Sequence, residues 1–216
     1  MSAIFQHGEG SVSDADQRWQ DALARARRQD VLGGAVMKTY EDLLRRGHFQ
    51  YASGRHGEWY VEKFRLLQNP GLTGAMCASI VGCFRAEADV VAGPLIGGAL
   101  VAYQTALYMG ARCAVAERTA DGMGFRESMA PGPGDRVLVV DDVLTTGGSI
   151  RDVIDAVRRR GADVIGAAVL FDRSDRGVDV GVPLFAVERL SAPSYAAEDC
   201  PLCAERVPLD NPKGVR

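Results

Sequence analysis

The stretch Val137-Leu-Val-Val-Asp-Asp-Val-Leu-Thr-Thr-Gly-Gly-Ser149 decides the fold of this chain. Its four apolar residues, 137–140, predict a strand buried on both faces, because only a strand covered by helices can be apolar without alternation. Asp141 and Asp142 follow at the carboxyl end, where open α/β sheets bind their ligands. The turn at residues 145–149 then leads into a helical pattern. Its backbone N–H groups, hydroxyls and helix N-terminus favour an oxyanion such as phosphate.

A structural alternative exists for this stretch. Aspartates at strand ends and Ser or Thr at helix N-caps are common, and a capped helix after a strand would account for several of these residues. The thirteen positions match jointly, which favours the phosphate-binding interpretation. No Lys follows Gly147 and Gly148, so the stretch is not a Walker A loop and does not indicate a nucleoside triphosphatase.

Composition indicates an ordinary globular protein. The chain has 216 residues, 47% of them hydrophobic and 25% charged, which suits one domain with an appendage. Its net charge of −3 argues against a general nucleic-acid or membrane-surface binder. No apolar run approaches the roughly 18 residues of a membrane span, and no secretory signal is visible. The odd number of cysteines, five, favours a reducing cytoplasm.

The chain divides into three expected parts. Residues 1–12 lack periodicity and are expected to be disordered. Residues 13–47 are expected to form two helices that cover the domain or join a dimer. Residues 48–210 are expected to form the main domain, and within it residues 48–62 form a hairpin that turns at Ser53 and Gly54.

Strand and helix patterns alternate through the main domain. Strands are expected near residues 88–92, 112–116, 137–140, 164–171 and 183–190, and helices near 70–85, 99–109 and 150–160. The glycine-rich turn at 93–99 can bind an anion, although such turns also serve close packing. The polar segment 117–128 suits a mobile lid.

The strand, the Asp-Asp pair and the Thr/Gly/Ser turn together resemble the type I phosphoribosyltransferases, which bind phosphoribosyl pyrophosphate (PRPP). The pair Asp172-Arg173 resembles the orotate phosphoribosyltransferases of this fold, as does the Cys200-Pro-Leu-Cys203 tail of their short-loop branch. Ala52 departs from the family, which usually has Lys or Arg at that position. The hairpin matches the family's hood segment at Phe49, Ser53, Gly54, Arg55 and Tyr60.

The resemblance implies an α/β fold: a Rossmann-like parallel sheet of the type I phosphoribosyltransferase kind, with a small hood and extra N-terminal helices. It implies transfer of the phosphoribosyl group of PRPP to N1 of orotate, giving orotidine 5′-monophosphate and pyrophosphate in pyrimidine biosynthesis. Two alternatives stay open: a phosphoribosyltransferase for another base or a specialised acceptor, and a PRPP-binding regulator without catalysis. The implied cofactor is Mg²⁺, and the implied assembly is a homodimer that shares the lid 117–128 between subunits. Members of this family can also hold a non-proline cis peptide in the loop at residues 95–98.

The resemblance also implies roles for individual residues. Asp141 and Asp142 would hold the ribose hydroxyls, and Arg118 would stabilise the leaving pyrophosphate, since a guanidinium binds phosphate bidentately. Thr145 and Arg173 would contact orotate. No protein ligand is assigned to Mg²⁺, which takes most of its ligands from substrate phosphates and water. The PRPP site would comprise Leu95, Ile96, Gly97, Gly98, Asp141, Asp142, Val143, Leu144, Thr145, Thr146, Gly147, Gly148 and Ser149.

Several of these residues have structural alternatives. Arg118 and Arg126 could be solvated charges of a loop, and Arg173 could form a structural salt bridge. Cys200 and Cys203 form a C-x-x-C pair with no second pair nearby, which is at most half of a zinc site. The other three cysteines fall in expected core elements, where they would pack as small apolar residues.

Overall fold

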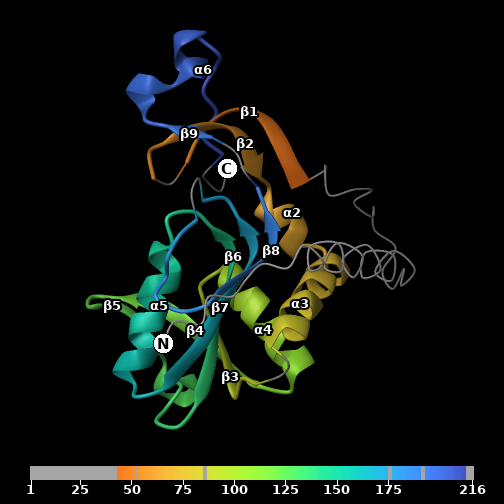
Figure 1. Ribbon diagram of the computed structural model, residues 1–216, viewed down its shortest axis with the longest axis vertical. Helices are drawn as coiled ribbons and strands as arrows, with labels where there is room; N and C mark the ends of the chain where they lie inside the picture. The colour runs from red at the N-terminus through yellow and green to blue at the C-terminus, as the bar shows by residue number, and fades with distance from the viewer. Residues whose placement is uncertain (1–42, 52, 85–86, 175–176, 191–192, 213–216) are drawn as a thin grey trace, which may run out of the picture.

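The computed structural model describes residues 43–51, 53–84, 87–174, 177–190 and 193–212 as two sheets, with helices packed around the larger one (Figure 1). The larger sheet has six strands in the order β5-β4-β3-β6-β7-β8. All neighbours in it run parallel except β4 and β5. Its strands are β3 (Val90–Pro94), β4 (Arg112–Thr119), β5 (Gly122–Phe125), β6 (Arg136–Leu144), β7 (Asp163–Asp172) and β8 (Leu184–Arg189).

Helices cover both faces of this sheet. Helices α3 (Pro70–Phe84) and α4 (Gly97–Met109) pack on one face, and α5 (Gly148–Arg159) packs on the other (Figure 1). The strand β6 shows why both faces are apolar. Leu138 and Val140 belong to the core beneath α3 and α4, whereas Val137 and Val139 belong to the core beneath α5. All four are fully buried, as the run without alternation predicts. The α/β fold class is confirmed.

The smaller sheet, which we call the hood, has the order β1-β2-β9 and lies beyond the main sheet (Figure 1). The predicted hairpin is confirmed: β1 (Leu44–Gln50) pairs antiparallel with β2 (His56–Val61), and Gly54 takes a φ of +80° at the turn. The short strand β9 (Ser194–Tyr195) pairs with β2, and Arg55 donates a hydrogen bond from Nε to Ser194 Oγ at 2.8 Å. A short helix, α2 (Lys63–Leu67), connects the hairpin to α3.

The expected helix over the second part of residues 13–47 is wrong at its end. The structure places Leu44 at the start of β1, opposite Val61, with Leu43 buried in the main core. Arg45 reinforces this pairing through ion pairs to Glu62 and Asp210. Strand pairing therefore overrides the helical spacing of these apolar residues. The predicted disorder of residues 1–12 and the helices expected over 13–42 lie outside the described residues.

The segment 117–128, in which a mobile lid is expected, is largely a β-hairpin. Strands β4 and β5 pair from Ala116–Phe125 to Thr119–Gly122, and the Thr119 hydroxyl donates to the Gly122 carbonyl at 3.0 Å. A 3-10 turn, η2 (Glu127–Met129), follows. Backbone pairing places most of these residues on the edge of the main sheet, and their role as a lid stays a prediction.

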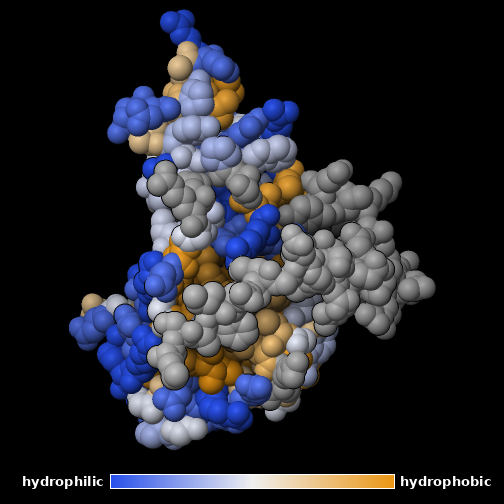
Figure 2. Space-filling view, in the orientation of Figure 1, coloured by the Kyte–Doolittle hydropathy of each residue, from blue (hydrophilic) through white to orange (hydrophobic). Residues whose placement is uncertain are grey.

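No helix among the described residues is long and apolar enough to cross a membrane. On the face shown in Figure 2, hydrophilic residues dominate the hood and the side where α5 lies. Hydrophobic residues show between hydrophilic ones in the part that carries the main sheet, without forming a continuous band.

Candidate active site

Two carboxylates end the buried part of β6. Asp141 and Asp142 are only 8% and 3% exposed, and Asp141 Oδ1 accepts a hydrogen bond from the Asp142 N–H at 2.8 Å. Their space comes from glycines at the start of α4. A Cβ on Gly97 would lie 1.7 Å from Asp142 Oδ2, and one on Gly98 would lie 2.9 Å from Asp141 Oδ1. The glycine pair and the aspartate pair therefore fit together as one unit.

The electrostatics of this pair are unusual. Burial, reinforced by the neighbouring Asp142 carboxylate, raises the pKa of Asp141 to about 8. Asp142 has a cationic partner, since Lys63 Nζ lies 3.0 Å from Asp142 Oδ2 and 3.4 Å from Oδ1. The Oδ2 atom is nevertheless buried without a hydrogen bond of good geometry, so the ion pair leaves it free to accept one. Buried acceptors of this kind suit a ligand that brings hydroxyl donors.

The loop between β3 and α4 runs beside these carboxylates. The peptide bond between Leu95 and Ile96 is cis, as members of the family can have, and both side chains are more than half exposed. The Leu95 N–H donates to the Ala116 carbonyl at 3.0 Å, which ties the loop to β4. A Cβ on Gly93 would lie 2.2 Å from the Gly98 carbonyl oxygen, so only glycine allows this close turn. The loop thus brings the N-terminus of α4 to the edge where β6 ends.

The turn after β6 forms a small open pocket lined by Asp141, Ile150 and the residues between Val143 and Ser149. Gly147 takes a φ of +77° at the N-cap of α5, and a Cβ there would lie 2.6 Å from Val178. Arg151 supports the turn by donating to the Thr146 carbonyl at 2.9 Å and to the Asp179 carbonyl. The side chains of Thr145, Thr146 and Ser149 are exposed at this helix N-terminus, where an anion is favoured.

Arg173 leaves the carboxyl end of β7 and points to the hood. Its guanidinium lies 4.2 Å from the centroid of the Tyr51 ring, and its Nη2 is 3.4 Å from the Trp59 carbonyl oxygen. The Arg173 N–H donates to the Leu144 carbonyl, so this residue lies next to the turn after β6. Among the described residues, its guanidinium takes part in no ion pair, which disfavours the structural salt bridge. Asp172 instead accepts hydrogen bonds from Ser174.

The two arginines of the predicted lid differ in their environment. Arg126 is held by Glu117, with Nε 2.6 Å from Oε1 and Nη2 3.2 Å from Oε2, and has a structural role. Arg118 is exposed on β4, two residues past the Ala116 carbonyl that receives the Leu95 N–H. In the part of the chain that the structure describes, no ion pair engages its guanidinium. Arg118 is thus placed at the same sheet edge as the loop at 95–98.

Two site residues were missed by sequence reasoning. Lys63 pairs with Asp142, and Tyr51 lies under Arg173. A signal for Lys63 existed, because it is one of only three lysines in the chain, against 22 arginines, and directly follows the hairpin. Nothing in the spacing indicated Tyr51, whose position depends on the folding of the hood over β7. Ala52, where the family usually has a basic residue, lies outside the described residues.

Comparisons with known proteins place this geometry in a family. Residues 66–184 match the phosphoribosyl transferase domain. The orotate phosphoribosyltransferase of Caldanaerobacter subterraneus subsp. tengcongensis is 39% identical over 180 residues, covering 82% of this chain and 95% of that protein. That of Pelotomaculum thermopropionicum is 43% identical over 167 residues, covering 77% and 88%. This chain belongs to the orotate phosphoribosyltransferase family.

A solved orotate phosphoribosyltransferase, from Aeropyrum pernix, has the same fold. It superposes with a TM-score of 0.59 at 29% identity, over 69% of this chain and 89% of that chain. Membership of the orotate phosphoribosyltransferase family confirms the predicted resemblance and the enzyme class, a phosphoribosyltransferase. The roles of single residues rest on the geometry described above.

Proposed function

We propose that this protein transfers the phosphoribosyl group of PRPP to N1 of orotate, giving orotidine 5′-monophosphate and pyrophosphate. One observation carries the proposal: the Asp141–Asp142 pair and Arg173 lie toward the carboxyl ends of the adjacent strands β6 and β7, and Arg173 contacts the hood. The relatives at 38–43% identity, which are named orotate phosphoribosyltransferases, support it. The reaction belongs to pyrimidine biosynthesis.

We assign three parts of PRPP, the ribose, the 5′-phosphate and the pyrophosphate, to three groups of residues. We assign the ribose hydroxyls to Asp141 and Asp142, because they are buried carboxylates beside glycines and Asp142 Oδ2 accepts no hydrogen bond within the described part of the chain. The 5′-phosphate is assigned to the turn after β6, whose hydroxyls and N–H groups surround the N-terminus of α5. The pyrophosphate is assigned to the β3–α4 loop, at Leu95, Ile96, Gly97 and Gly98.

The donor set suits a Mg²⁺ ion bound mainly through the substrate. Asp142 Oδ2 is a buried oxygen that accepts no hydrogen bond from the residues that the structure describes, and the absence of a Cβ at Gly97 gives it its place beside the loop. Asp141 and Asp142 are therefore the residues that would hold Mg²⁺, through water or ribose hydroxyls, since this ion keeps most of its water and phosphate ligands. When bound, Mg²⁺ would neutralise charge on the pyrophosphate.

The reaction needs charge stabilisation rather than a protein nucleophile. Orotate N1 forms a bond to C1′ as the C1′–O bond to pyrophosphate breaks; the bonding electrons leave with pyrophosphate, and the N1 proton is lost to solvent water or to the departing pyrophosphate. Negative charge grows on the leaving group, where the exposed guanidinium of Arg118 can meet it. Positive charge grows on the ribosyl ring, beside the aspartate pair. Lys63 holds Asp142 in position through its ion pair.

The base is assigned to the space between the hood and the end of β7. Arg173 rests on the Tyr51 ring there, and Tyr51 is itself fixed by a 2.6 Å hydrogen bond from its hydroxyl to the Trp59 carbonyl. A guanidinium held in this way can pair bidentately with the oxygens of a carboxylated pyrimidine. Thr145 lies next to it, since the Arg173 N–H donates to the Leu144 carbonyl.

We propose that the enzyme is a homodimer in the cytoplasm. Helix α4 exposes Leu100, Tyr103 and Leu107 on one side, with Ile96 just before its start, and each is 48–67% exposed. Exposed apolar residues at this spacing form a stripe suited to a second copy of the same helix. A dimer through α4 would also place the β3–α4 loops near the interface. None of the five cysteines, all of them among the described residues, forms a disulfide, which suits a reducing compartment.

The direct test mixes the protein with PRPP, Mg²⁺ and one base at a time, and follows pyrophosphate release. We expect turnover with orotate and none with adenine, hypoxanthine or uracil. Turnover with another acceptor but not with orotate would identify a different base specificity. PRPP binding without turnover on any base would identify a regulator and refute the proposed reaction.

A further inference from the structure

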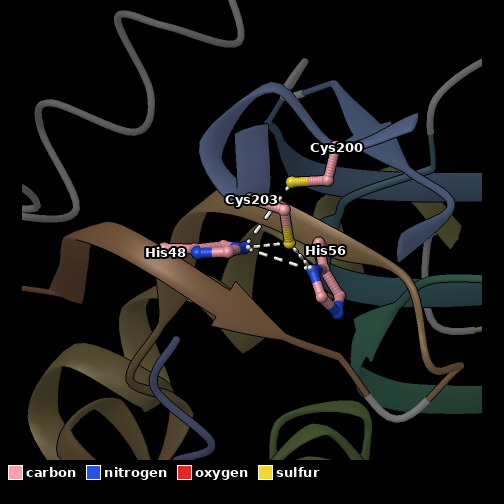
Figure 3. Close-up of side chains that lie close together, drawn as sticks. All are labelled: His48, His56, Cys200 and Cys203. Carbon is pink, nitrogen blue, oxygen red and sulfur yellow. Dashed lines mark hydrogen bonds between the residues drawn. The ribbon is translucent and has the colours of Figure 1, made fainter. Parts of the chain in front are cut away.

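Four metal-ligating side chains meet in the hood, away from the PRPP site. His48 comes from β1, His56 from β2, and Cys200 and Cys203 from the C-terminal segment that holds η3 (Ala197–Asp199) and α6 (Pro201–Ala204). Figure 3 shows the two sulfur atoms and the two imidazoles turned toward a common centre. Their ligand atoms all lie within 4.8 Å of one another. The C-x-x-C pair is thus completed by two histidines that lie about 150 residues earlier in the chain.

We propose that this cluster is a structural zinc site with the ligands His48 Nε2, His56 Nδ1, Cys200 Sγ and Cys203 Sγ. Zinc is favoured because it prefers four thiolate and imidazole ligands in a tetrahedron, whereas Mg²⁺ and Ca²⁺ prefer oxygen. All four positions are supplied by the protein, which is typical of a structural rather than a catalytic zinc ion.

The distances fit that geometry. With Zn–N about 2.0 Å and Zn–S about 2.3 Å, a tetrahedron separates two nitrogens by about 3.3 Å and a nitrogen from a sulfur by about 3.5 Å. The His48 and His56 nitrogens are 3.1 Å apart. Cys203 Sγ lies 3.3 Å from His56 Nδ1 and 3.7 Å from His48 Nε2, and Cys200 Sγ lies 3.5 Å from His48 Nε2.

The tautomer of His48 is set for coordination. Its Nδ1 lies 2.8 Å from the Val207 carbonyl oxygen, which can only accept a hydrogen bond. The proton is therefore on Nδ1, and the lone pair of Nε2 points to the other three ligands. Metal-bound histidines are commonly oriented by such a contact from the second ring nitrogen. This contact is independent of the four ligand atoms and supports the same site.

Burial supports a built site rather than a chance meeting of surface groups. His48, His56 and Cys200 are 3%, 4% and 3% exposed, while Cys203 is exposed and leaves an entry path. Polar groups at this level of burial need partners, and a zinc ion would satisfy all four at once.

The ion would fasten the hood together. Residues after α6 already join β1, because the Asp210 N–H donates to the His48 carbonyl at 2.7 Å and the Gln50 N–H donates to the Asp210 carbonyl. Zinc would add bonds from β1 and β2 to the Cys pair. Tyr51 follows β1 directly, so the metal would hold the surface on which Arg173 rests. Only this consequence depends on the proposed function; the site itself does not.

The experiment uses tag-free full-length protein, since affinity tags rich in histidine bind zinc. After dialysis against Zn²⁺ and then metal-free buffer, elemental analysis should find about one zinc per chain. Replacement with Co²⁺ should give the visible bands of a tetrahedral ion together with a thiolate-to-metal charge-transfer band. Wild-type protein that stays folded and zinc-free, or a Co²⁺ spectrum without thiolate bands, would overturn the proposal. So would a Cys200–Cys203 disulfide in protein isolated without reductant.

Variants separate the site from general thiol binding. Cys203→Ser removes an exposed ligand and should lose most of the bound zinc while the chain stays folded, as judged by circular dichroism. Cys83→Ser removes an exposed cysteine of α3, outside the cluster, and should keep zinc. Equal zinc content in the two variants would refute the assignment of ligands. These measurements do not involve turnover, so an enzyme inactive on orotate would leave the zinc result intact.

Discussion

Lys63 Nζ lies 3.0 Å from Asp142 Oδ2, and it links the first helix after the hood to the carboxylates at the end of β6. Asp142 is almost fully buried, so this cation offsets the cost of keeping a charge inside the sheet edge. Lys63 is about one-third exposed, which weakens the pair through solvent screening.

The variant Lys63→Met should therefore lower the free energy of unfolding by about 1–2 kcal/mol. The double variant Lys63→Met/Asp142→Asn should recover most of that loss, because the buried charge is then absent. Urea unfolding of wild type, the two single variants and the double variant gives the coupling free energy between Lys63 and Asp142. Arg65→Met, on the exposed side of the same helix, is the control. Additive effects would show that the two residues do not interact in solution.

The raised pKa of Asp141 predicts a pH-dependent stability. Its pKa is about 8 in the folded protein, against about 4 for an unfolded aspartate, so between these values the folded state holds a proton that the unfolded state has lost. The contribution of the Asp141 carboxyl to the free energy of unfolding is therefore fully present below pH ~4 and decreases as the pH rises to about 8. Asp141→Asn removes this loss.

We therefore expect Asp141→Asn to raise the Tm of the unliganded protein only slightly near pH 5. Near pH 8 the increase should be much larger, and should correspond to a gain in the free energy of unfolding on the order of several kcal/mol. Thermal unfolding from pH 5 to pH 9 measures the difference from wild type. Asp163→Asn, at the exposed start of β7, is the control. If the difference in Tm between Asp141→Asn and wild type does not grow with pH, the pKa of Asp141 is not raised in the folded protein.

The fit between Gly97 and Asp142 predicts a sharp effect of one methyl group. In Gly97→Ala the new Cβ would lie 1.7 Å from Asp142 Oδ2, so the carboxylate or the loop must move. We expect a loss of about 1–3 kcal/mol in stability and a large loss of PRPP affinity, measured by calorimetry. Gly82→Ala adds the same methyl group to α3 in open space, and should be neutral or stabilising by up to about 1 kcal/mol. Normal PRPP binding by Gly97→Ala would refute the role of this contact.

Arg173→Ala should separate the two substrates. Removing a charged hydrogen-bonding group is worth about 1.5–3 kcal/mol, so the KM for orotate should rise by about 10- to 100-fold. The Kd for PRPP should change little, because Arg173 faces the hood rather than the phosphate-binding turn. Arg189→Ala, on the exposed end of β8, is a matched control. Equal losses for orotate and PRPP would mean that Arg173 is structural.

The apolar stripe on α4 predicts self-association. Sedimentation equilibrium should find a dimer at micromolar concentration, and Leu107→Asp should shift it to monomer, since a charge cannot be buried unpaired in an apolar interface. Leu209→Asp makes the same change at an exposed leucine outside α4 and should leave the dimer intact. A wild-type monomer would exclude the proposed dimer.

The sequence predicted the parts of the fold that depend on local pattern. Residues 137–140 are apolar without alternation, and the two cores on either side of β6 explain why. Leu44 was assigned to a helix because its neighbours have helical spacing, yet its pairing with Val61 is a contact that spacing cannot reveal. In the predicted lid, an Asp-Gly pair at Asp121 and Gly122 is typical of a hairpin turn. The φ of +108° at Gly122 agrees with that turn, so the sequence contains a local indication of this hairpin.

The residue pattern indicated the site most clearly where one segment carries it, whereas Arg118 and Arg173 were named from the family resemblance. The aspartate pair and the turn after β6 lie in one stretch, so their proximity follows from the chain itself. Tyr51, His48 and His56 acquire their partners from β7 and the C-terminal segment, and no single stretch contains both sides of these contacts. The contact between Tyr51 and Arg173 and the full set of four proposed zinc ligands therefore could not be predicted from local sequence, because they depend on long-range packing.

The strand order β1-β2-β9 affects the order in which parts of the protein can fold during synthesis on the ribosome. The hood is built from residues that precede and follow the whole main sheet, so the sheet is inserted between two parts of the hood. The phosphate-binding turn can form once β6 and α5 have been synthesised. The hood has to wait for Ser194 and the cysteines beyond it. A nascent chain can therefore complete the turn after β6 before it completes the hood.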